Sequence, residues 1–259
     1  MAGERGGIGD RFQQETKYHR EKMAGGFLDW RKKPEEFKEY PRDIQKFSLR
    51  DGNKGGGDPL WEVMARRRSV RDFLPKEISL EELSQLIWAT QGITTGSAYG
   101  FRLRVTPSAG ALYPIETYIV VNRVVGLSPG SYHFNVKENQ LEQLAVGDFR
   151  VNIAASALDQ SMAREAAVVF VWTAVVERTK WKYRERGYRY LYLDAGHIGQ
   201  NLYLAAISLG LGCCTIGAFY DDEVNQLIGV DGQQETAVYL GAVGHVYERE
   251  REGMGKRKS

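Results

Sequence analysis

The chain contains, at residues 66–73, the stretch Arg66-Arg67-Arg68-Ser69-Val70-Arg71-Asp72-Phe73, in which four arginines and a serine fall within six residues. Guanidinium groups are planar and always charged, and they can hold a phosphate through two parallel hydrogen bonds. A serine beside them adds a neutral donor of the kind that phosphates accept. The stretch therefore predicts a site for an anion. The alternative is a solvated basic helix end, where the helix dipole favours positive charge.

The residues before this stretch predict a helix. Four of them recur at helical spacing and indicate one buried face: Leu60, Val63, Met64 and Arg67. Asp58 is a suitable N-cap residue, and Pro59 suits the first helical position because an N–H there would have no partner within the helix. We therefore expect the helix to begin at Asp58-Pro59 and to present the basic stretch at its end.

Length and composition narrow the class of protein. The 259 residues suit one large or two small domains, and 42% apolar with 26% charged residues is ordinary for a globular protein. A net charge of +2 is too small to imply nucleic acid, so the arginines indicate a local anion. Cys213 and Cys214 form neither a disulfide framework nor a metal-ligand spacing. Without an apolar run long enough for a signal peptide or a membrane span, we expect a soluble, cytoplasmic protein.

Residues 1–57 differ from the rest, because they are polar, rich in charge and interrupted by glycine pairs. Their aromatic residues are too many for a plain disordered tail and include Tyr18, Phe27, Trp30, Phe37, Tyr40 and Phe47. We predict an N-terminal arm, followed by the main domain at 58–259. The arm would lay aromatic anchors across the main body or across a second subunit, and a flexible leader is the alternative.

The first half of the main domain predicts a helix and then a strand meander. Ser79 and Glu82 form a capping box, and that helix should end near Gln91-Gly92, before a loop at 94–100. Three strands are expected within 115–146 in an antiparallel meander, at Thr117–Val121, Ser131–Phe134 and Gln140–Leu144.

The second half contains helices and buried strands without a regular β-α alternation. We expect a helix at 148–160, a buried central strand at Ala166–Val176, a polar segment at Thr179–Arg189, a long helix at Tyr190–Leu209 closed by Gly210 and Gly212, a strand at Cys213–Gly217, a short helix from Asp221 and a last strand at Ala237–Val243. Small residues on the long helix permit close approach of another helix, in the core or at a dimer interface. Strands gathered in meanders predict an α+β fold, with a central, mostly antiparallel sheet flanked by helices.

Several kinds of chemistry are poorly supported. No Walker loop is present, and no Gly-x-Gly-x-x-Gly opens a helix after a strand. The four histidines show no zinc spacing, so we expect no metal site, and Ser108 has no obvious partner base. The basic stretch, the small-residue loop Pro107–Pro114 and the later pair Arg249 and Arg251 instead fit a phosphate-bearing planar cofactor that supplies redox chemistry.

Four ordered motifs resemble the FMN-dependent nitroreductase superfamily and, within it, the branch of SagB-type dehydrogenases. They are Arg67–Phe73, Pro107–Pro114, Asp194-Ala195-Gly196-His197 with Gln200-Asn201-Leu202 and Gly210-Leu211-Gly212, and Ile216–Phe219. The likeness covers roughly residues 58–247 and is more specific than any motif alone. It implies a nitroreductase-like fold and a homodimer, with the long helix at the dimer interface and two FMN sites shared between subunits.

The resemblance also implies a role for each motif. The cofactor-binding residues of the basic stretch would be Arg67, Arg68, Ser69 and Arg71. Arg67 and Ser69 would hold the phosphate and ribityl chain, and Arg71 would face the N1/O2 edge of the flavin, where a cation favours the reduced form. Arg249 or Arg251 would complete the phosphate site.

Two further groups would contact the flavin ring. Pro107, Ser108, Ala109 and Gly110 would reach it from the other subunit, and Thr215, Ile216, Gly217 and Ala218 would lie against the opposite face, with a backbone N–H near N5. Gly217 stands where nitroreductases carry an acidic residue, which argues against simple nitroreductase behaviour.

The SagB-type branch includes oxidases that convert azolines in peptides to azoles with a Lys-Tyr pair. Lys182-Tyr183 lies where that pair would be expected and is the candidate catalytic pair, with a solvated basic loop as the alternative. A lysine base needs a lowered pKa, which burial or the charges of Lys180, Arg184 and Arg186 would supply.

Three functions follow from the resemblance. The first is an FMN-dependent reductase or dehydrogenase of a small molecule that uses NAD(P)H. The second is an azoline oxidase that acts on a modified peptide and passes electrons to oxygen. The third is a flavin-binding partner protein without catalysis.

Overall fold

The computed structural model describes residues 6–22, 28–98 and 101–247. Its centre is a seven-stranded sheet in the order β1-β6-β5-β4-β7-β9-β8, in which every pairing is antiparallel. The strands are β1 (Lys46–Ser48), β4 (Ile115–Val121), β5 (Gly130–Asn135), β6 (Gln140–Val146), β7 (Val168–Val175), β8 (Leu211–Ile216) and β9 (Glu235–His245). The predicted α+β class, the meander within 115–146 and the central strand near 166–176 are confirmed.

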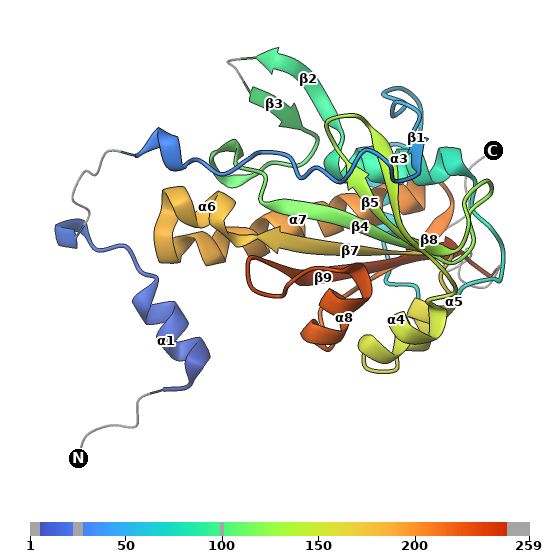
Figure 1. The fold of residues 1–259 in the computed structure, drawn as a ribbon. Coiled ribbons are helices and arrows are strands. Elements are labelled where there is room, and N and C mark those ends of the chain that lie inside the picture. The colour runs from blue at the N-terminus through green and yellow to red at the C-terminus, as the bar shows by residue number, and fades with distance from the viewer. Residues whose placement is uncertain (1–5, 23–27, 99–100, 248–259) are drawn as a thin grey trace.

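The middle strands are largely apolar on both faces, and helices cover both sides of the sheet (Figure 1). The long helix α7 (Gly187–Ser208) and α3 (Leu80–Gln91) cover one face, where they pack with alternate sheet residues such as Ile119 and Phe170. Three shorter helices, α4 (Arg150–Ser156), α5 (Ser161–Glu165) and α8 (Asp221–Ile228), cover the other face, which contains Tyr118 and Val171. Successive side chains of a strand point to opposite faces, so one sheet supplies both cores.

Two predicted helix starts have different outcomes. The capping box is confirmed, because the Ser79 side chain accepts from the Glu82 N–H and the Glu82 side chain accepts from the Ser79 N–H. The prediction of Asp58 as an N-cap was wrong. Helix α2 (Leu60–Arg66) has Pro59 at its N-cap, and Asp58 instead pairs with Arg66.

Three segments differ from the prediction in secondary structure. Residues expected to form a loop at 94–100 belong largely to the hairpin of β2 (Ile93–Ala98) and β3 (Phe101–Arg104), while residues 99–100 lie outside the described residues. The helix expected at 148–160 is shorter, because α4 ends at Ser156 and Leu158 and Asp159 have φ of 56° and 57°; a separate helix, α5, begins at Ser161. The polar segment at 179–189 contains α6 (Val176–Tyr183), the 3₁₀ turn η4 (Arg184–Arg186) and the start of α7.

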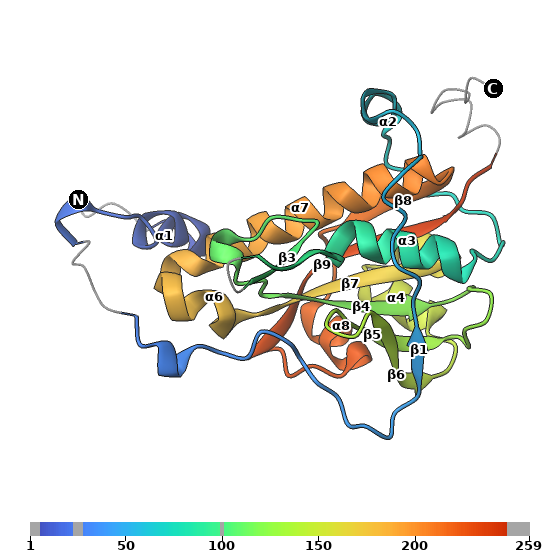
Figure 2. The same ribbon diagram turned by 90° about the horizontal axis from the view of Figure 1, so that it is seen from above.

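The arm contacts the body of its own chain at several separate points, and Figure 2 shows its course from α1 to β1. It contains α1 (Ile8–Glu15), η1 (Arg20–Lys22), η2 (Trp30–Lys32) and β1, which pairs with β6 at the edge of the sheet. Near its start, Thr16 accepts hydrogen bonds from Arg186 and Arg189. Of the predicted anchors, Trp30 packs on Trp181, Tyr40 on His133 and Phe47 on Tyr132, while Phe27 lies outside the described residues. The division into an arm and a domain at residue 58 stays a prediction.

Candidate functional site

The basic stretch lies along β8 and β9 at the edge of the sheet. The Val70 N–H donates to the Cys213 carbonyl at 2.9 Å, and Phe73 pairs with Val246. Gly212 explains the close approach, because a Cβ there would lie 2.4 Å from Val246 Cγ1 and 3.1 Å from Val70 Cβ. With Val70 and Phe73 buried, Ser69 and Arg71 remain exposed.

A cluster of hydroxyl groups joins this stretch to the end of β8. The Tyr203 hydroxyl on α7 lies 2.9 Å from Ser69 Oγ and accepts from the Thr215 N–H at 3.0 Å. The Tyr239 hydroxyl donates to Thr215 Oγ1 at 2.6 Å. The Arg67 guanidinium lies 5.2 Å from the centre of the Tyr203 ring. The structure thus brings Arg67, Ser69 and Thr215 together through Tyr203, which the sequence reasoning missed.

The other predicted residues of these two motifs have mixed surroundings. Arg68 donates to the carbonyls of Ala65 and Arg67 at 3.2 and 2.7 Å, so its guanidinium is turned toward the end of α2. Ile216 is buried, whereas Gly217 and Ala218 are exposed immediately after β8. Arg249 and Arg251 lie outside the described residues.

The loop Pro107–Pro114 has an unusual backbone. Gly110, Ala111 and Tyr113 have φ of 65°, 54° and 46°, all in the left-handed region. Only glycine enters this region without a steric penalty. Strain of about 1–3 kcal/mol at a non-glycine residue persists only where the surroundings enforce it, and it is common at functional sites.

Asp194 on α7 holds this loop in place. Its carboxylate accepts from Ser108 Oγ at 2.6 Å and from the Ala109 N–H at 3.3 Å, while Ser108 Oγ accepts from the Tyr113 N–H at 3.0 Å. Burial raises the pKa of Asp194, and the bonds from Ser108 and Ala109 oppose that rise. The sequence offered one sign of this role, an acidic residue on the buried face of a core helix.

Lys182 and Tyr183, at the end of α6, lie against the same loop. A Cβ at Gly110 would be 2.6 Å from the Tyr183 hydroxyl and 2.9 Å from Lys182 Nζ, so a larger residue there would push these side-chain ends away. The Lys182 ammonium also lies 5.3 Å from the centre of the Tyr183 ring. The structure therefore places the predicted pair beside the predicted loop.

The two groups of predicted residues are separate within one chain. Asp194 binds the loop at Pro107–Pro114, and Tyr203 contacts the basic stretch at Ser69. Both residues lie on α7. The two residues are nine steps apart, which at 1.5 Å per helical residue corresponds to about 14 Å along the helix axis.

A buried ionic network lies behind the loop and connects it with the sheet. Arg178 Nη1 donates to Glu116 Oε1 at 2.5 Å, and His133 lies between Glu116 and Glu142 at 3.2 and 2.9 Å. Burial alone would raise the pKa of Glu116, but Arg178 and His133 outweigh it and lower that pKa to about 2. Burial would lower the pKa of His133, yet its bonds to the two carboxylates raise it.

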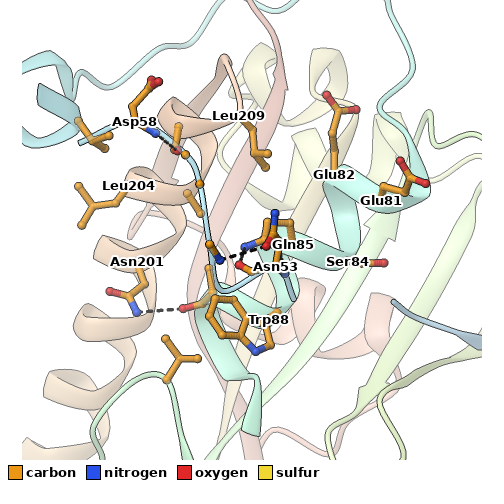
Figure 3. A pocket seen from close by; sticks show the side chains of 18 of the residues that line it. Asn53, Asp58, Glu81, Glu82, Ser84, Gln85, Trp88, Asn201, Leu204 and Leu209 are labelled. Carbon is orange, nitrogen blue, oxygen red and sulfur yellow. Dashed lines mark hydrogen bonds between the residues drawn. The ribbon is translucent and has the colours of Figure 1, made fainter. Parts of the chain in front are cut away.

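A cavity of about 910 Å³ lies on another face of α7, between that helix, α3 and the segment at 50–58 (Figure 3). Trp88, Asn201 and Asp58 contribute to its lining, but none of the predicted site residues does. Some of its amides are already engaged: Asn201 donates to the Ala89 carbonyl at 2.9 Å, and Gln85 bonds with the Asn53 backbone. This cavity is therefore distinct from the candidate site.

The described residues show neither a metal-type cluster of side chains nor a helix that could span a membrane. In the parts of the chain that the structure describes, no three histidine, cysteine, aspartate or glutamate side chains gather as a metal site would require. Within the same residues, every helix is too short or too polar to cross a membrane.

Comparisons with known proteins agree with the fold and the motifs. The model of the nitroreductase family matches residues 64–245. A nitroreductase-like protein of Methanocaldococcus jannaschii is 36% identical over 171 residues, which cover 66% of this chain and 84% of that protein. The trifolitoxin-processing protein TfxB of Rhizobium leguminosarum bv. trifolii is 33% identical over 174 residues, or 64% of this chain and 47% of TfxB.

A solved structure extends the likeness to three dimensions. The crystal structure of a nitroreductase-like protein from Anabaena variabilis superimposes with a TM-score of 0.74 at 30% identity, over 92% of this chain and 47% of that one. The chain thus spans about half the length of TfxB and of the Anabaena protein.

The fold and the comparisons define an α+β oxidoreductase built on a central antiparallel sheet. The chain belongs to the nitroreductase family, and its match with TfxB supports the SagB-type branch. The predicted family and nitroreductase-like fold are confirmed.

Proposed function

We propose that this protein is a homodimeric, FMN-dependent oxidoreductase whose two cofactor sites are shared between subunits. Each site would combine Arg67, Ser69 and Arg71 of one subunit with the loop at Pro107–Gly110 of the other. The observation that carries the proposal is the separation of these two groups along α7, because a second copy can bring them together.

The exposed face of α7 supports a dimer. Tyr192 and Leu193 are each 58% exposed, and a Cβ at Gly196 would have no neighbour within 4 Å. On α2, which packs on α7, Trp61 is 77% exposed. Large apolar side chains gathered on one face are typical of an interface, and a two-fold axis would place the same face on both partners.

The residues present fit FMN. Guanidinium and hydroxyl groups at Arg67 and Ser69 are suitable donors for a phosphate monoester, and Arg71 is an exposed cation. Gly110, Gly217 and Ala218 offer exposed backbone with little or no side chain, against which a flat ring can pack. Arg249 or Arg251 would add to the phosphate site.

FMN, when bound, supplies the redox chemistry by exchanging a hydride at its N5 atom. The chain's own contribution would be proton transfer by Lys182 and Tyr183, which lie against Gly110. Conversion of an azoline to an azole removes one proton and one hydride from the ring and forms one double bond. Lys182 or Tyr183 would take the proton, and dioxygen would be the final oxidant.

Two substrate classes remain in the proposal. The position of Lys182 and Tyr183 and the match with a protein named for trifolitoxin processing favour azoline oxidation in a peptide. Reduction of a small molecule with electrons from NAD(P)H is the second candidate, favoured by the match with the nitroreductase-like protein of M. jannaschii.

Absorption spectra before and after anaerobic NADPH test this proposal. We expect flavin absorption bands at about 370 and about 450 nm after incubation with FMN, because these bands belong to the cofactor. Bleaching by NADPH would select the reductase, whereas bleaching by an azoline peptide alone would select the oxidase. If neither compound reduces the bound flavin, the protein is a flavin-binding partner without catalysis. If the protein retains no flavin, the proposal is contradicted.

A further inference from the structure

We propose that residues 29–38 of the arm form a strap that positions α6. This inference rests on the proposed proton transfer by Lys182 and Tyr183, which lie at the end of that helix. The strap residues would be positioning residues, because they act through α6 and not on the substrate. Figures 1 and 2 both show the chain before β1 running beside α6.

The strap contacts the turn of α6 that carries the pair. The rings of Trp30 and Trp181 meet edge to face, with centres 5.5 Å apart and planes at 67°. Trp181 Nε1 donates to the Asp29 carbonyl at 3.2 Å, and Arg178 Nε donates to the Glu35 carbonyl at 2.8 Å. Trp181 directly precedes Lys182, and Arg178 lies one helical turn earlier.

The far end of the strap is tied to the sheet. Lys38 Nζ lies 2.6 Å from Glu235 Oε2 on β9 and 2.6 Å from the Tyr118 hydroxyl on β4. The Phe37 ring lies beneath the guanidinium of Arg102, 5.5 Å from its centre. The strap is thus fixed at Lys38 and can resist movement of α6 at Trp30.

Helix α6 depends on such contacts because it is short and weakly capped. It has eight residues, no side-chain hydrogen bond at its N-cap, and Arg184 with φ of 50° at its C-cap. An isolated helix of that length is not stable in water, so tertiary contacts must hold it. Two of the side chains that hold it, Arg178 and Trp181, bond to the strap.

The strap lies outside the residues that match the nitroreductase family, which begin at residue 64. The sheet and the candidate cofactor residues are therefore expected to form without it. What the strap adds is the placement of Lys182 and Tyr183 against Gly110. A misplacement of about 1 Å can cost about a hundredfold in rate, so a modest loosening of α6 should be measurable.

Trp30→Ala tests the strap in the full chain. Trp30 is 65% exposed, so its loss should leave the fold and the FMN content unchanged. We expect faster hydrogen exchange of the amides of residues 176–183. We also expect the kcat for azole formation from an azoline peptide to fall by about tenfold or more. Trp30→Phe, which keeps an aromatic edge against Trp181, should restore both, and Lys32→Ala, at an exposed neighbour, should change neither.

The outcomes separate the strap from the proposed function. Unchanged exchange in α6 of Trp30→Ala would overturn the strap whatever the activity. Faster exchange with unchanged kcat would overturn its positioning role. Full azole formation by Lys182→Ala would instead overturn the proposed function, and the exchange result would stand without it.

Discussion

Asp194 is the residue on which the geometry of the loop at Pro107–Pro114 depends. It accepts hydrogen bonds from Ser108 and Ala109, and both donors are partly buried. Asp194→Ala leaves these donors without a partner, and a hydrogen bond to a charged group contributes about 1.5–3 kcal/mol. We expect FMN to bind about tenfold or more weakly in a fluorescence titration.

Asp194→Asn is the matched variant for this prediction. The amide oxygen can still accept from Ser108, so this variant should retain most of the affinity. Wild-type affinity in Asp194→Ala would show that the loop does not contribute to the cofactor site.

Arg71 and Arg68 make a second comparison between single residues. Arg71 is exposed beside Ser69, whereas the guanidinium of Arg68 donates to backbone carbonyls. If Arg71 faces the flavin edge where negative charge develops, Arg71→Ala should weaken FMN retention and make the two-electron midpoint potential more negative by about 30 mV, which corresponds to about 1.4 kcal/mol.

Arg68→Ala is the control, and it should shift the potential less than Arg71→Ala does. Spectroelectrochemical titration of both variants gives the comparison. Equal potentials for Arg71→Ala and the wild-type protein would remove Arg71 from the flavin edge.

At the scale of elements, the sequence predicted those parts whose signal is local. Long runs of β-branched residues specify β4 and β7, and the Ser79-Glu82 box specifies the start of α3. Helix α6 was missed because its basic residues resemble a solvated loop, and its stability comes from Arg178 and Trp181. The break between α4 and α5 gave little signal, because Leu158 rarely adopts the left-handed region and Asp159 does so only occasionally.

The network of Glu116, His133, Arg178 and Glu142 joins α6 to three strands, so its charge state should affect stability. Arg178 and His133 hold the pKa of Glu116 at about 2, below its ordinary value of 4.5. A lowered pKa gives stability that is fully present above pH 4.5 and is lost as the pH falls toward 2. We expect the melting temperature to fall over that interval.

His133 gives the opposite dependence, because its raised pKa contributes stability that is present below its ordinary value of 6.5 and is lost as the pH rises through the raised value. Glu116→Gln is the informative variant: it should be less stable at neutral pH and have a shallower acid limb. Thermal melts from pH 2 to 8 measure both. An acid limb as steep in Glu116→Gln as in the wild-type protein would show that other carboxylates dominate it.

At the scale of the whole molecule, the sequence motifs define residues of the candidate site but not their arrangement. Arg67, Ser69 and Thr215 meet around Tyr203, whose hydroxyl carries no sequence signal within an apolar helix. Lys182 and Tyr183 meet Gly110 because α6 folds back on the loop. The motifs that one cofactor would need lie in two groups along α7. The order of residues in the sequence does not tell whether the two groups of one chain, or groups from two chains, form one site.

A composite site between subunits predicts complementation between two damaged chains. Arg67→Glu would damage the residues proposed to hold the phosphate. Gly110→Val would damage the loop, because a β-branched residue is strained at φ of 65° and its Cβ would displace the ends of the Tyr183 and Lys182 side chains. Each variant alone should form dimers without FMN. A mixed dimer would contain one site with both defects and one site with neither.

The measurement that tests this account most directly is therefore the FMN content of a one-to-one mixture of these variants, after denaturation and refolding together. Random pairing makes half of the dimers mixed, so we expect about one quarter of the wild-type FMN content, with neither variant alone retaining any. Failure of the mixture to bind FMN, although the wild-type protein binds it after the same treatment, would contradict a site shared between two subunits.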